Sequence, residues 1–271
     1  MYKLIASDLD GTLLQDDKSL SKENDQAMFE IAKKGVHFVP CSGRSVFEIP
    51  TYVREHPAVR YVIGGDGSMI YDRETGEQTI FGMPKEVVQT VLDIYAEYDV
   101  SLSVRYKGKC YVRADEHDVD IYRSYRYDDA YIDFLYAFSH QVEDFNAFCR
   151  RLDEIEMICA FFKTDEEWKS CQARMDALDT VQTAVCNDNS FEVFSIDAGK
   201  GKAMLRLAET LGIDQSETIA VGDTINDRTS VQAAGLGLAM GNGYEEIKAI
   251  ADAVVCRNDE HVARYLLEHY L

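Results

Sequence analysis

Hydrophobic and polar residues follow one another along the chain in blocks that predict alternating strands and helices near both ends. The apolar run from Tyr2 to Ser7 predicts a first strand. A helix is expected from Ser21, whose hydroxyl can cap its first turn, and Gly35 is a typical helix stop. The apolar positions of this helix recur on one face: Ala27, Met28, Ile31 and Ala32.

Further short apolar runs continue this alternation. They predict strands at Val36–Val39, at Tyr61–Ile63 and at Ile219–Val221, with a less regular segment around Phe47–Val53 before the second of them. Alternating strands and helices imply a parallel sheet with helices on both faces and right-handed crossovers. We therefore expect an α/β fold with a Rossmann-like parallel-sheet core, in which ligands lie outside the carboxyl ends of the strands.

The middle of the chain has a different pattern. Its helices and short strands indicate an α+β insert, with two of the strands close enough for a hairpin around Lys107-Gly108-Lys109. We place the core at residues 1–82 and 187–271 and the insert at residues 83–186, and we find no internal repeat or low-complexity segment. The expected elements of the insert are Pro84–Tyr98, Leu102–Tyr106, Cys110–Val112, Met157–Phe162 and Asp165–Leu178.

Two carboxylates stand one residue apart where the first strand ends, in the segment Ser7-Asp8-Leu9-Asp10-Gly11. One aspartate can attack phosphorus while its neighbour carries a proton to and from the leaving oxygen. Gly11 permits the tight turn that would direct both side chains to one ligand. The alternative is an ordinary Asx turn after a strand, since Asp-Gly pairs are common turn formers.

Three later motifs add groups suited to phosphate and to a hard cation. Cys41-Ser42-Gly43-Arg44 follows a strand and offers a hydroxyl, backbone amides and a guanidinium. Lys200-Gly201-Lys202 opens a helical segment, and Gly222-Asp223-Thr224-Ile225-Asn226-Asp227 follows an apolar run. Each has an ordinary alternative: a solvated lysine at 200, a surface arginine at 44, or a helix cap at 227.

These four motifs, in this order, resemble those of the haloacid dehalogenase superfamily of phosphatases, and within it the Cof-type, or type IIB capped, hydrolases. The resemblance implies that Asp8 is the nucleophile and Asp10 the general acid and base, with Lys200 as the third catalytic residue. It implies a Mg²⁺ cofactor whose metal-site residues are Asp8, Asp10 through its backbone carbonyl, Asp223 and Asp227, the last of them beside both the metal and the lysine. The substrate-binding positions that it implies are Ser42, Gly43, Arg44 and Asn226.

Some positions depart from that family pattern. Ser42 stands where a threonine is usual and keeps the hydroxyl, whereas Asp66-Gly67 replaces an Asn-Gly pair. Arg228-Thr229-Ser230 replaces apolar residues, and Glu260-His261-Val262 stands where an acid, a glycine and a valine are usual. None of these changes removes a catalytic group.

Composition limits the class of protein. With 271 residues, 46% of them hydrophobic, the chain can bury substantial cores. Its formal charge of −20 argues against a nucleic-acid or membrane partner, and it also repels phosphate esters at long range. The expected partner, a small-molecule phosphate ester, is what the family resemblance implies. The seven cysteines are scattered without a paired spacing, which indicates reduced thiols. Cys41 invites comparison with cysteine phosphatases, but the run of amides that such chemistry needs is missing.

The expected compartment is the cytoplasm, because the first strand begins at once and no apolar run approaches the roughly 18 residues of a membrane span. The sequence does not indicate the oligomeric state. A tyrosine- and arginine-rich segment, Asp120–Phe134, could line a pocket in the insert, although packing of its tyrosines on the insert's sheet is the simpler interpretation.

We therefore expect a magnesium-dependent phosphatase that acts through an aspartyl-phosphate on Asp8, with the insert as a cap that sets specificity. Two alternatives remain open: a phosphomutase that moves the phosphoryl group between sugar hydroxyls, and a non-catalytic protein that binds a phosphorylated metabolite. Hexose phosphates, pentose phosphates, flavin mononucleotide and pyridoxal phosphate all remain possible substrates.

Overall fold

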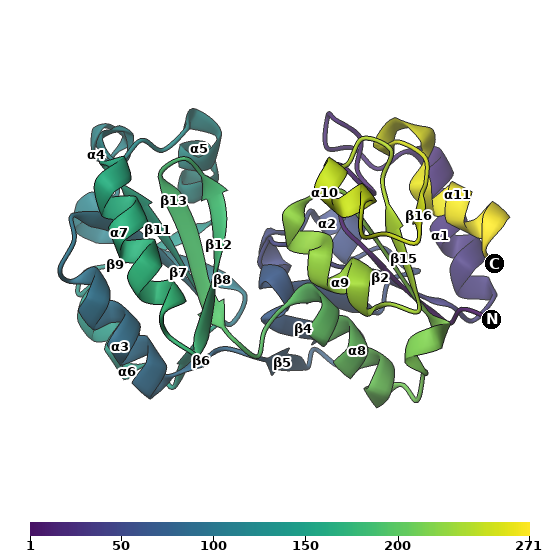
Figure 1. Ribbon diagram of the computed structural model, residues 1–271, viewed down its shortest axis with the longest axis horizontal. Helices are drawn as coiled ribbons and strands as arrows, with labels where there is room; N and C mark the ends of the chain where they lie inside the picture. Colours follow the sequence, from purple (N-terminus) through teal and green to yellow (C-terminus); the bar gives the residue numbers. More distant parts are fainter. The chain divides into compact units, whose positions relative to one another are not determined.

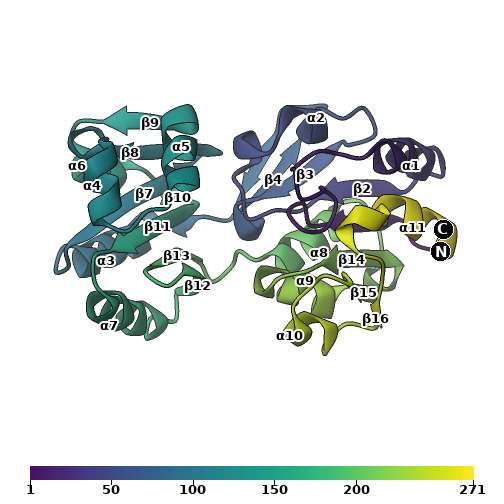
Figure 2. The ribbon, with the colours of Figure 1, turned by 90° about the horizontal axis from the view of Figure 1, so that it is seen from above.

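The structure, a computed structural model, describes residues 1–271 and divides into two compact units. The core unit comprises Met1–Thr79 and Gly199–Leu271, and the inserted unit comprises Ile80–Ala198. Both units combine helices with sheets, and the chain leaves the core unit and returns to it once (Figures 1 and 2). No helix is long and apolar enough to cross a membrane.

A five-stranded parallel sheet forms the centre of the core unit, in the order β16-β15-β14-β1-β2. Helices pack on it in pairs, α1 with α11 and α8 with α9. The expected α/β core with parallel strands is therefore confirmed. The strands are β1 (Leu4–Ser7), β2 (His37–Pro40), β14 (Thr218–Gly222), β15 (Leu236–Ala239) and β16 (Ala253–Val254). The helices are α1 (Lys22–Lys33), α2 (Thr51–Arg54), α8 (Lys200–Thr210), α9 (Arg228–Ala233), α10 (Glu245–Lys248) and α11 (Val262–His269).

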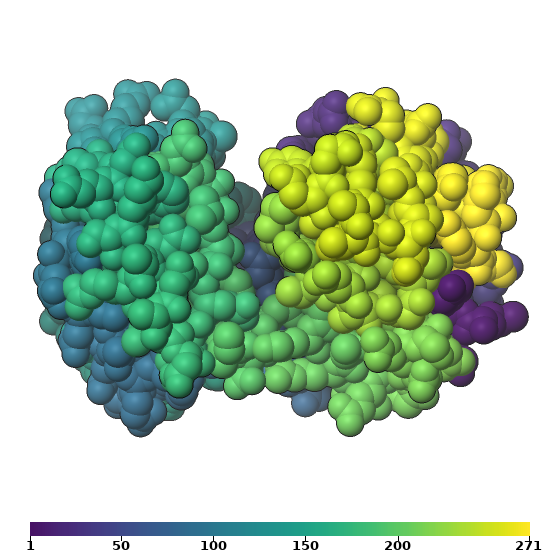
Figure 3. Space-filling view, in the orientation of Figure 1, coloured from purple at the N-terminus to yellow at the C-terminus, as the bar shows by residue number.

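The helix expected from Ser21 is α1. The Ser21 hydroxyl accepts a hydrogen bond from the Asn24 amide (3.2 Å), and Gly35 follows the helix in a left-handed conformation with φ +77°. Ala27, Met28 and Ile31 are buried, as the apolar stripe predicts. In Figure 3 the C-terminal segments from α9 to α11 cover the upper part of the core-unit face that is turned toward the viewer, and α8 lies below them.

The strand expected at Tyr61–Ile63 exists, but it begins a separate sheet. β3 (Tyr61–Gly64), β4 (Met69–Asp72) and β5 (Gln78–Ile80) form three neighbouring strands, of which β3 and β4 are antiparallel. One parallel bridge, Cys41 to Ile63, joins β3 to the end of β2. The carboxyl end of β3 is therefore held beside the segment that carries Ser42.

A six-stranded sheet, in the order β12-β13-β11-β7-β8-β9, forms the centre of the inserted unit. The expected hairpin is confirmed, because β7 and β8 pair antiparallel on either side of Lys107 and Gly108. The strands are β6 (Met83–Pro84), β7 (Val100–Tyr106), β8 (Lys109–Arg113), β9 (Ser139–Val142), β10 (Glu154–Ile155), β11 (Met157–Phe162), β12 (Val181–Asn187) and β13 (Ser190–Ser195). The helices are α3 (Lys85–Tyr95), α4 (Val119–Ser124), α5 (Asp129–Phe138), α6 (Phe145–Arg151) and α7 (Asp165–Asp176).

Each face of this sheet carries its own apolar cluster. One face packs against α3, α6 and α7, and alternate residues of β11, such as Ile158 and Phe162, point into that cluster. The other face packs against α4 and α5, where the Tyr127 ring stacks on Phe161 with centroids 3.8 Å apart. Tyr122, Tyr125 and Tyr127 are buried, so these tyrosines pack on the sheet, as the simpler interpretation expected.

The second boundary of the insert differs from the expected position. Residue 186 falls inside β12, and the inserted unit continues through β13 to Ala198. β13 pairs with both β11 and β12 and thus lies within the inserted sheet. The apolar run of β13 resembles a core strand in sequence, so the pattern alone did not assign it to its sheet.

Candidate active site

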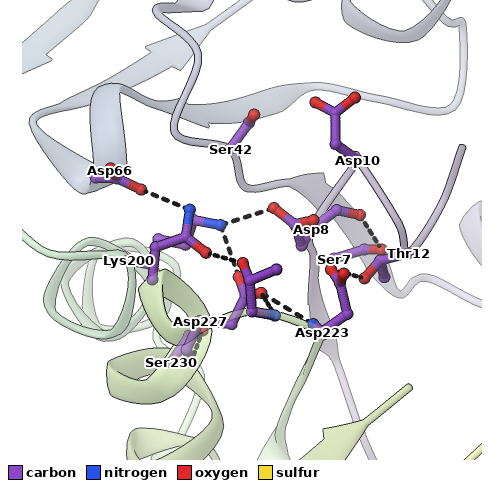
Figure 4. A network of polar contacts seen from close by, with 12 residues as sticks. Ser7, Asp8, Asp10, Thr12, Ser42, Asp66, Lys200, Asp223, Asp227 and Ser230 are labelled. Atoms are coloured by element: carbon purple, nitrogen blue, oxygen red, sulfur yellow. Dashed lines mark hydrogen bonds and ion pairs between the residues drawn. The ribbon is translucent and has the colours of Figure 1, made fainter. Parts of the chain in front are cut away.

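Four charged side chains from separate parts of the core unit meet at the carboxyl end of the parallel sheet (Figure 4). Asp8 directly follows β1, Asp223 directly follows β14, and Lys200 opens α8. The Lys200 Nζ atom lies 2.7 Å from Asp8 Oδ1 and 2.6 Å from Asp227 Oδ1. Lys200 is only 1% exposed, which excludes the solvated lysine considered from the sequence.

Three buried carboxylates share this small volume. Asp8, Asp223 and Asp227 each offer an oxygen atom, and these atoms lie within 4.8 Å of one another. Burial and the Asp227 carboxylate raise the pKa of Asp8 well above its ordinary value, although Lys200 opposes the rise. Burial and Asp227 likewise raise the pKa of Asp223 to about 6. One lysine therefore does not offset three acids, and this all-oxygen donor set fits a hard divalent cation.

Lys200 itself remains an ammonium group. Burial alone would lower its pKa, but the carboxylates of Asp227 and Asp8 outweigh burial and raise it well above the ordinary value. The lysine can thus serve as a fixed positive charge beside the Asp8 carboxylate.

Asp227 uses both of its oxygens within the protein. Oδ1 accepts the Lys200 ammonium, while Oδ2 accepts the amides of Asp223 (3.0 Å) and Thr224 (3.1 Å). A Cβ atom at Gly222 would lie 2.2 Å from Asp227 Cγ, so only glycine leaves room for this carboxylate. Asp227 therefore fixes the loop after β14 and orients the lysine.

Asp223 is held from the other side by the turn after β1. The Thr12 hydroxyl donates to Asp223 Oδ1 (3.0 Å), and the Asn242 side-chain amide donates to the Gly11 carbonyl (2.8 Å). Sequence reasoning missed Thr12 and Asn242. The position of Thr12 next to the paired aspartates was a usable signal, and the segment Ala239-Met240-Gly241-Asn242 resembles the same subfamily, although no role was assigned to it.

Asp10 lies in a separate group of charges. Its carboxylate accepts two hydrogen bonds from the Arg44 guanidinium, both 2.8 Å, and Lys18 Nζ lies 2.9 Å from its Oδ1 atom. Burial favours the neutral form of Asp10, but these bonds from Arg44 and Lys18 prevail and lower its pKa. Figure 4 shows this carboxylate apart from the acids around Lys200. The sequence did not point to Lys18.

The remaining predicted positions lie along the loops that follow β2 and β14. Ser42 is buried, its amide donates to the Ile63 carbonyl (3.0 Å), and its hydroxyl accepts the Arg44 amide (3.2 Å). The Asn226 side-chain amide donates to Asp66 Oδ1 (3.2 Å). A Cβ atom at Gly43 would lie 3.2 Å from that same oxygen, so Gly43 lets the two loops approach.

Cys41 does not suit nucleophilic chemistry. Its side chain is buried at the end of β2, and burial raises the pKa of the thiol. A cysteine nucleophile needs the thiolate, which burial and the nearby carboxylates disfavour. The local environment thus agrees with the sequence-based argument against a cysteine phosphatase.

Comparisons with known proteins give a consistent result. Residues 5–266 match the family model of the haloacid dehalogenase-like hydrolases. The chain is 31% identical to Phosphatase YwpJ of Bacillus subtilis over 99% of this chain and all of that protein. A solved haloacid dehalogenase-like hydrolase from B. subtilis shares 29% identity, with a TM-score of 0.80 over 99% of this chain and all of that one. A haloacid dehalogenase subclass IIB sugar phosphatase shares the fold at 20% identity, with a TM-score of 0.78 over 98% of both chains.

Proposed function

Because this chain belongs to the haloacid dehalogenase-like hydrolase family and is a phosphatase of the Cof type, we propose that it hydrolyses small-molecule phosphate monoesters with Mg²⁺ through an aspartyl-phosphate on Asp8. The observation that carries this proposal is the contact between Asp8 and the buried Lys200, 2.7 Å apart, beside Asp223. A nucleophilic carboxylate, a fixed cation and further oxygen ligands are the groups that phosphoryl transfer requires.

The proposed reaction has two steps. Asp8 attacks phosphorus and the bond to the ester oxygen breaks, while Asp10 gives a proton to the leaving alkoxide. Asp10 has to take up that proton before this step, because Arg44 and Lys18 lower its pKa and favour the carboxylate. Water then attacks the aspartyl-phosphate, Asp10 accepts the proton of that water, and inorganic phosphate leaves with Asp8 regenerated. Lys200 stabilises the charge on the transferring oxygens, and Ser42 and Asn226 bind the phosphoryl group beside it.

Magnesium fits the donor set of this site. Asp8, Asp223 and the backbone carbonyl of Asp10 would hold the ion, which would screen the nucleophile from the anionic ester and neutralise charge in the transition state. Asp227 lies beside these ligands, but both its oxygens already accept hydrogen bonds from the protein. We therefore assign Asp227 to holding Lys200 and the Asp223 loop.

The inserted unit, Ile80–Ala198, is proposed as the cap that contacts the leaving group. The core unit provides groups for phosphate and metal, so discrimination among alcohols needs further contacts. A panel of metabolite phosphates, including hexose, pentose and cofactor phosphates, would identify the preferred substrate class. Release of inorganic phosphate is the readout.

Substitution of the nucleophile tests the proposal directly. We expect Asp8→Asn to abolish phosphate release from 4-nitrophenyl phosphate, and a chelator to abolish it in the unmodified protein until Mg²⁺ is restored. Asp93→Asn makes the same chemical change at a surface ion pair with Arg150 and serves as the matched control. Full turnover by Asp8→Asn would contradict the assignment of the nucleophile.

A further inference from the structure

Two cations converge on the single carboxylate of Asp10. The Arg44 guanidinium binds this carboxylate in a bidentate arrangement. Lys18 Nζ lies 2.9 Å from Oδ1, one of the two oxygens that Arg44 contacts. Two positive charges against one negative charge leave this group with a formal charge of +1. The Lys18 side chain is 57% exposed, and those of Arg44 and Asp10 are each 33% exposed, so an incoming molecule can reach all three.

Hydrogen bonds fix the conformation of the loop that carries Lys18. The Gln15 amide donates to the Ser19 carbonyl (3.0 Å), and the Lys18 amide donates back to the Gln15 carbonyl (2.9 Å). Lys18 adopts a left-handed conformation with φ +65°, which is uncommon for a residue with a side chain. Tyr52 of α2 donates its hydroxyl to the Lys18 carbonyl. These contacts hold an unfavourable backbone conformation and thereby aim the lysine at Asp10.

The neighbouring acids of this loop keep their negative charge but form no ion pair with Lys18 or Arg44. The Asp17 carboxylate accepts the Ser19 amide (2.9 Å), and the Asp16 carboxylate accepts the Asn258 side-chain amide (2.9 Å). Lys200, the cation of the reaction centre, is already paired with Asp8 and Asp227. The positive surplus is therefore confined to the direct contacts of Lys18 and Arg44 with Asp10.

The leaving group must lie on that same side. In the proposed reaction Asp10 donates its proton to the ester oxygen, so the alcohol portion of the substrate extends past Asp10. Lys18 and Arg44 are within hydrogen-bond distance of the Asp10 carboxylate and thus border the space that the alcohol enters. Tyr52 contributes a half-exposed ring next to Lys18.

We propose that Lys18 and Arg44 form an anion-binding subsite for the leaving group, so that the enzyme favours phosphate monoesters whose alcohol carries a second anionic group, a carboxylate or a second phosphate. This inference rests on the proposed function. An exposed ion pair alone contributes little to stability, so the fixed loop at Lys18 is better explained by recognition of a ligand. Two cationic donors suit the oxygens of either anion.

A pair of nearly isosteric esters tests the subsite. The probes are 3-carboxyphenyl phosphate and the neutral 3-carbamoylphenyl phosphate, and the measured quantity is the ratio of their kcat/KM values. We expect the unmodified enzyme to favour the carboxylate by about tenfold, in line with one charge-assisted hydrogen bond. Lys18→Met should lower the ratio at least fivefold, chiefly through KM, and Lys18→Arg should restore it. Lys33→Met, at an exposed lysine of α1, removes the same charge and should leave the ratio unchanged.

The outcomes separate the two proposals. A ratio near one in the unmodified enzyme, or an equal loss for both esters in Lys18→Met, would overturn the subsite, since Lys18 would then only position Asp10. Failure of the unmodified enzyme to hydrolyse either ester with Mg²⁺ would instead contradict the proposed function. In that case calorimetric dissociation constants for the two esters still decide whether the carboxylate is preferred.

Discussion

Lys200 determines the electrostatic balance of the site at the scale of single residues. Its ammonium lies between Asp8 and Asp227, and all three side chains are buried. A buried ion pair that loses one partner is costly, because a charge without compensation stays in a low-dielectric surrounding. The lysine therefore stabilises the charged forms of Asp8 and Asp227, whereas burial still raises the pKa of both Asp8 and Asp223, the carboxylates that a cation would stabilise.

Gly11 offers a test of how strictly the turn after β1 is specified. Its φ is +83°, and a Cβ atom there would lie 2.3 Å from Asp223 Oδ2. We expect Gly11→Ala to displace the Asp223 carboxylate and to lower kcat/KM by about 10²-fold, the usual consequence of misplacing a reacting group by about 1 Å. Phosphate release measures the activity, and urea unfolding measures the stability.

Gly35→Ala is the matched control for that substitution. Gly35 has a similar φ of +77°, but a Cβ atom there would meet no other atom within 4 Å. We expect Gly35→Ala to lower the free energy of unfolding by only about 1 kcal/mol, the strain of an alanine in a left-handed conformation. Activity should be retained. Equal activity in the two variants would show that the close approach of Gly11 to Asp223 is not needed.

At the scale of helices and strands, the elements with a strong local sequence signal were predictable. The cap at Ser21, the apolar stripe of α1 and the continuous apolar run of β11 each satisfy local chemistry and packing together. Strands β6 and β10 are two residues long and exist because they pair with each other, which no local pattern encodes. The assignment of β13 to the inserted sheet likewise depends on long-range pairing.

The site residues likewise fall into those that the sequence predicts and those that depend on tertiary contacts. Asp8, Asp223 and Lys200 could be proposed from sequence because each lies in a motif at an element's end, where parallel strands bring side chains together. Lys18 could not, because its side chain reaches Asp10 only through a left-handed backbone turn held by a residue of α2. The φ value of a non-glycine loop residue depends on such tertiary contacts and is not visible in composition or spacing.

The turn of the β7–β8 hairpin binds a buried carboxyl group, that of Glu156, which directly precedes β11. The pKa of this group is unusual. Glu156 is 1% exposed, its Oε1 atom accepts the Gly108 amide (2.9 Å), and its Oε2 atom is buried without a hydrogen-bond partner. Burial raises the pKa of Glu156 from 4.5 to about 7, although the turn amides and Arg105 favour the charged form. Glu154 adds a further, smaller increase.

We expect this carboxyl group to make stability depend on pH. A folded-state pKa above the unfolded value favours folding below about pH 4.5, and the benefit is lost as pH rises through about 7. The loss is at most about 3 kcal/mol. Urea unfolding at pH 5 and pH 8 should therefore show a smaller pH dependence in Glu156→Gln than in the unmodified protein. Glu154→Gln, which changes the charge equally at a half-buried site, is the control, and identical pH dependence in all three proteins would contradict the prediction.

At the scale of the whole molecule, the acidic charge and the local cations act in opposite directions. The formal charge of −20 repels phosphate esters at long range. Lys200, Lys18 and Arg44 provide positive charge only close to the reacting groups. Binding of an anionic substrate therefore depends on short-range contacts and on the metal ion, with little help from long-range attraction.

The inserted unit contains apolar cores of its own. The inserted unit has a large apolar cluster on one face of its sheet and a second cluster on the other. Phe81 and Ala198, near its two ends, pack with Met157 and Phe194, so the chain begins and ends the unit at neighbouring points. A unit with its own core and adjacent ends is typical of an insertion that can fold alone.

We therefore expect a fragment of residues 80–198 to fold by itself. Its near-ultraviolet circular dichroism should show fixed aromatic packing, because the Tyr127–Phe161 stack and the Phe162–Phe191 pair lie wholly within the unit. Its thermal unfolding should be cooperative, and Phe161→Ala should destabilise it by about 3–5 kcal/mol through the loss of a buried ring.

A fragment of residues 83–186, which lacks β13, is the matched comparison. Since β13 pairs with both β11 and β12, that shorter fragment should lose the cooperative transition. Cooperative unfolding of the shorter fragment would mean that β13 is not required for the inserted sheet.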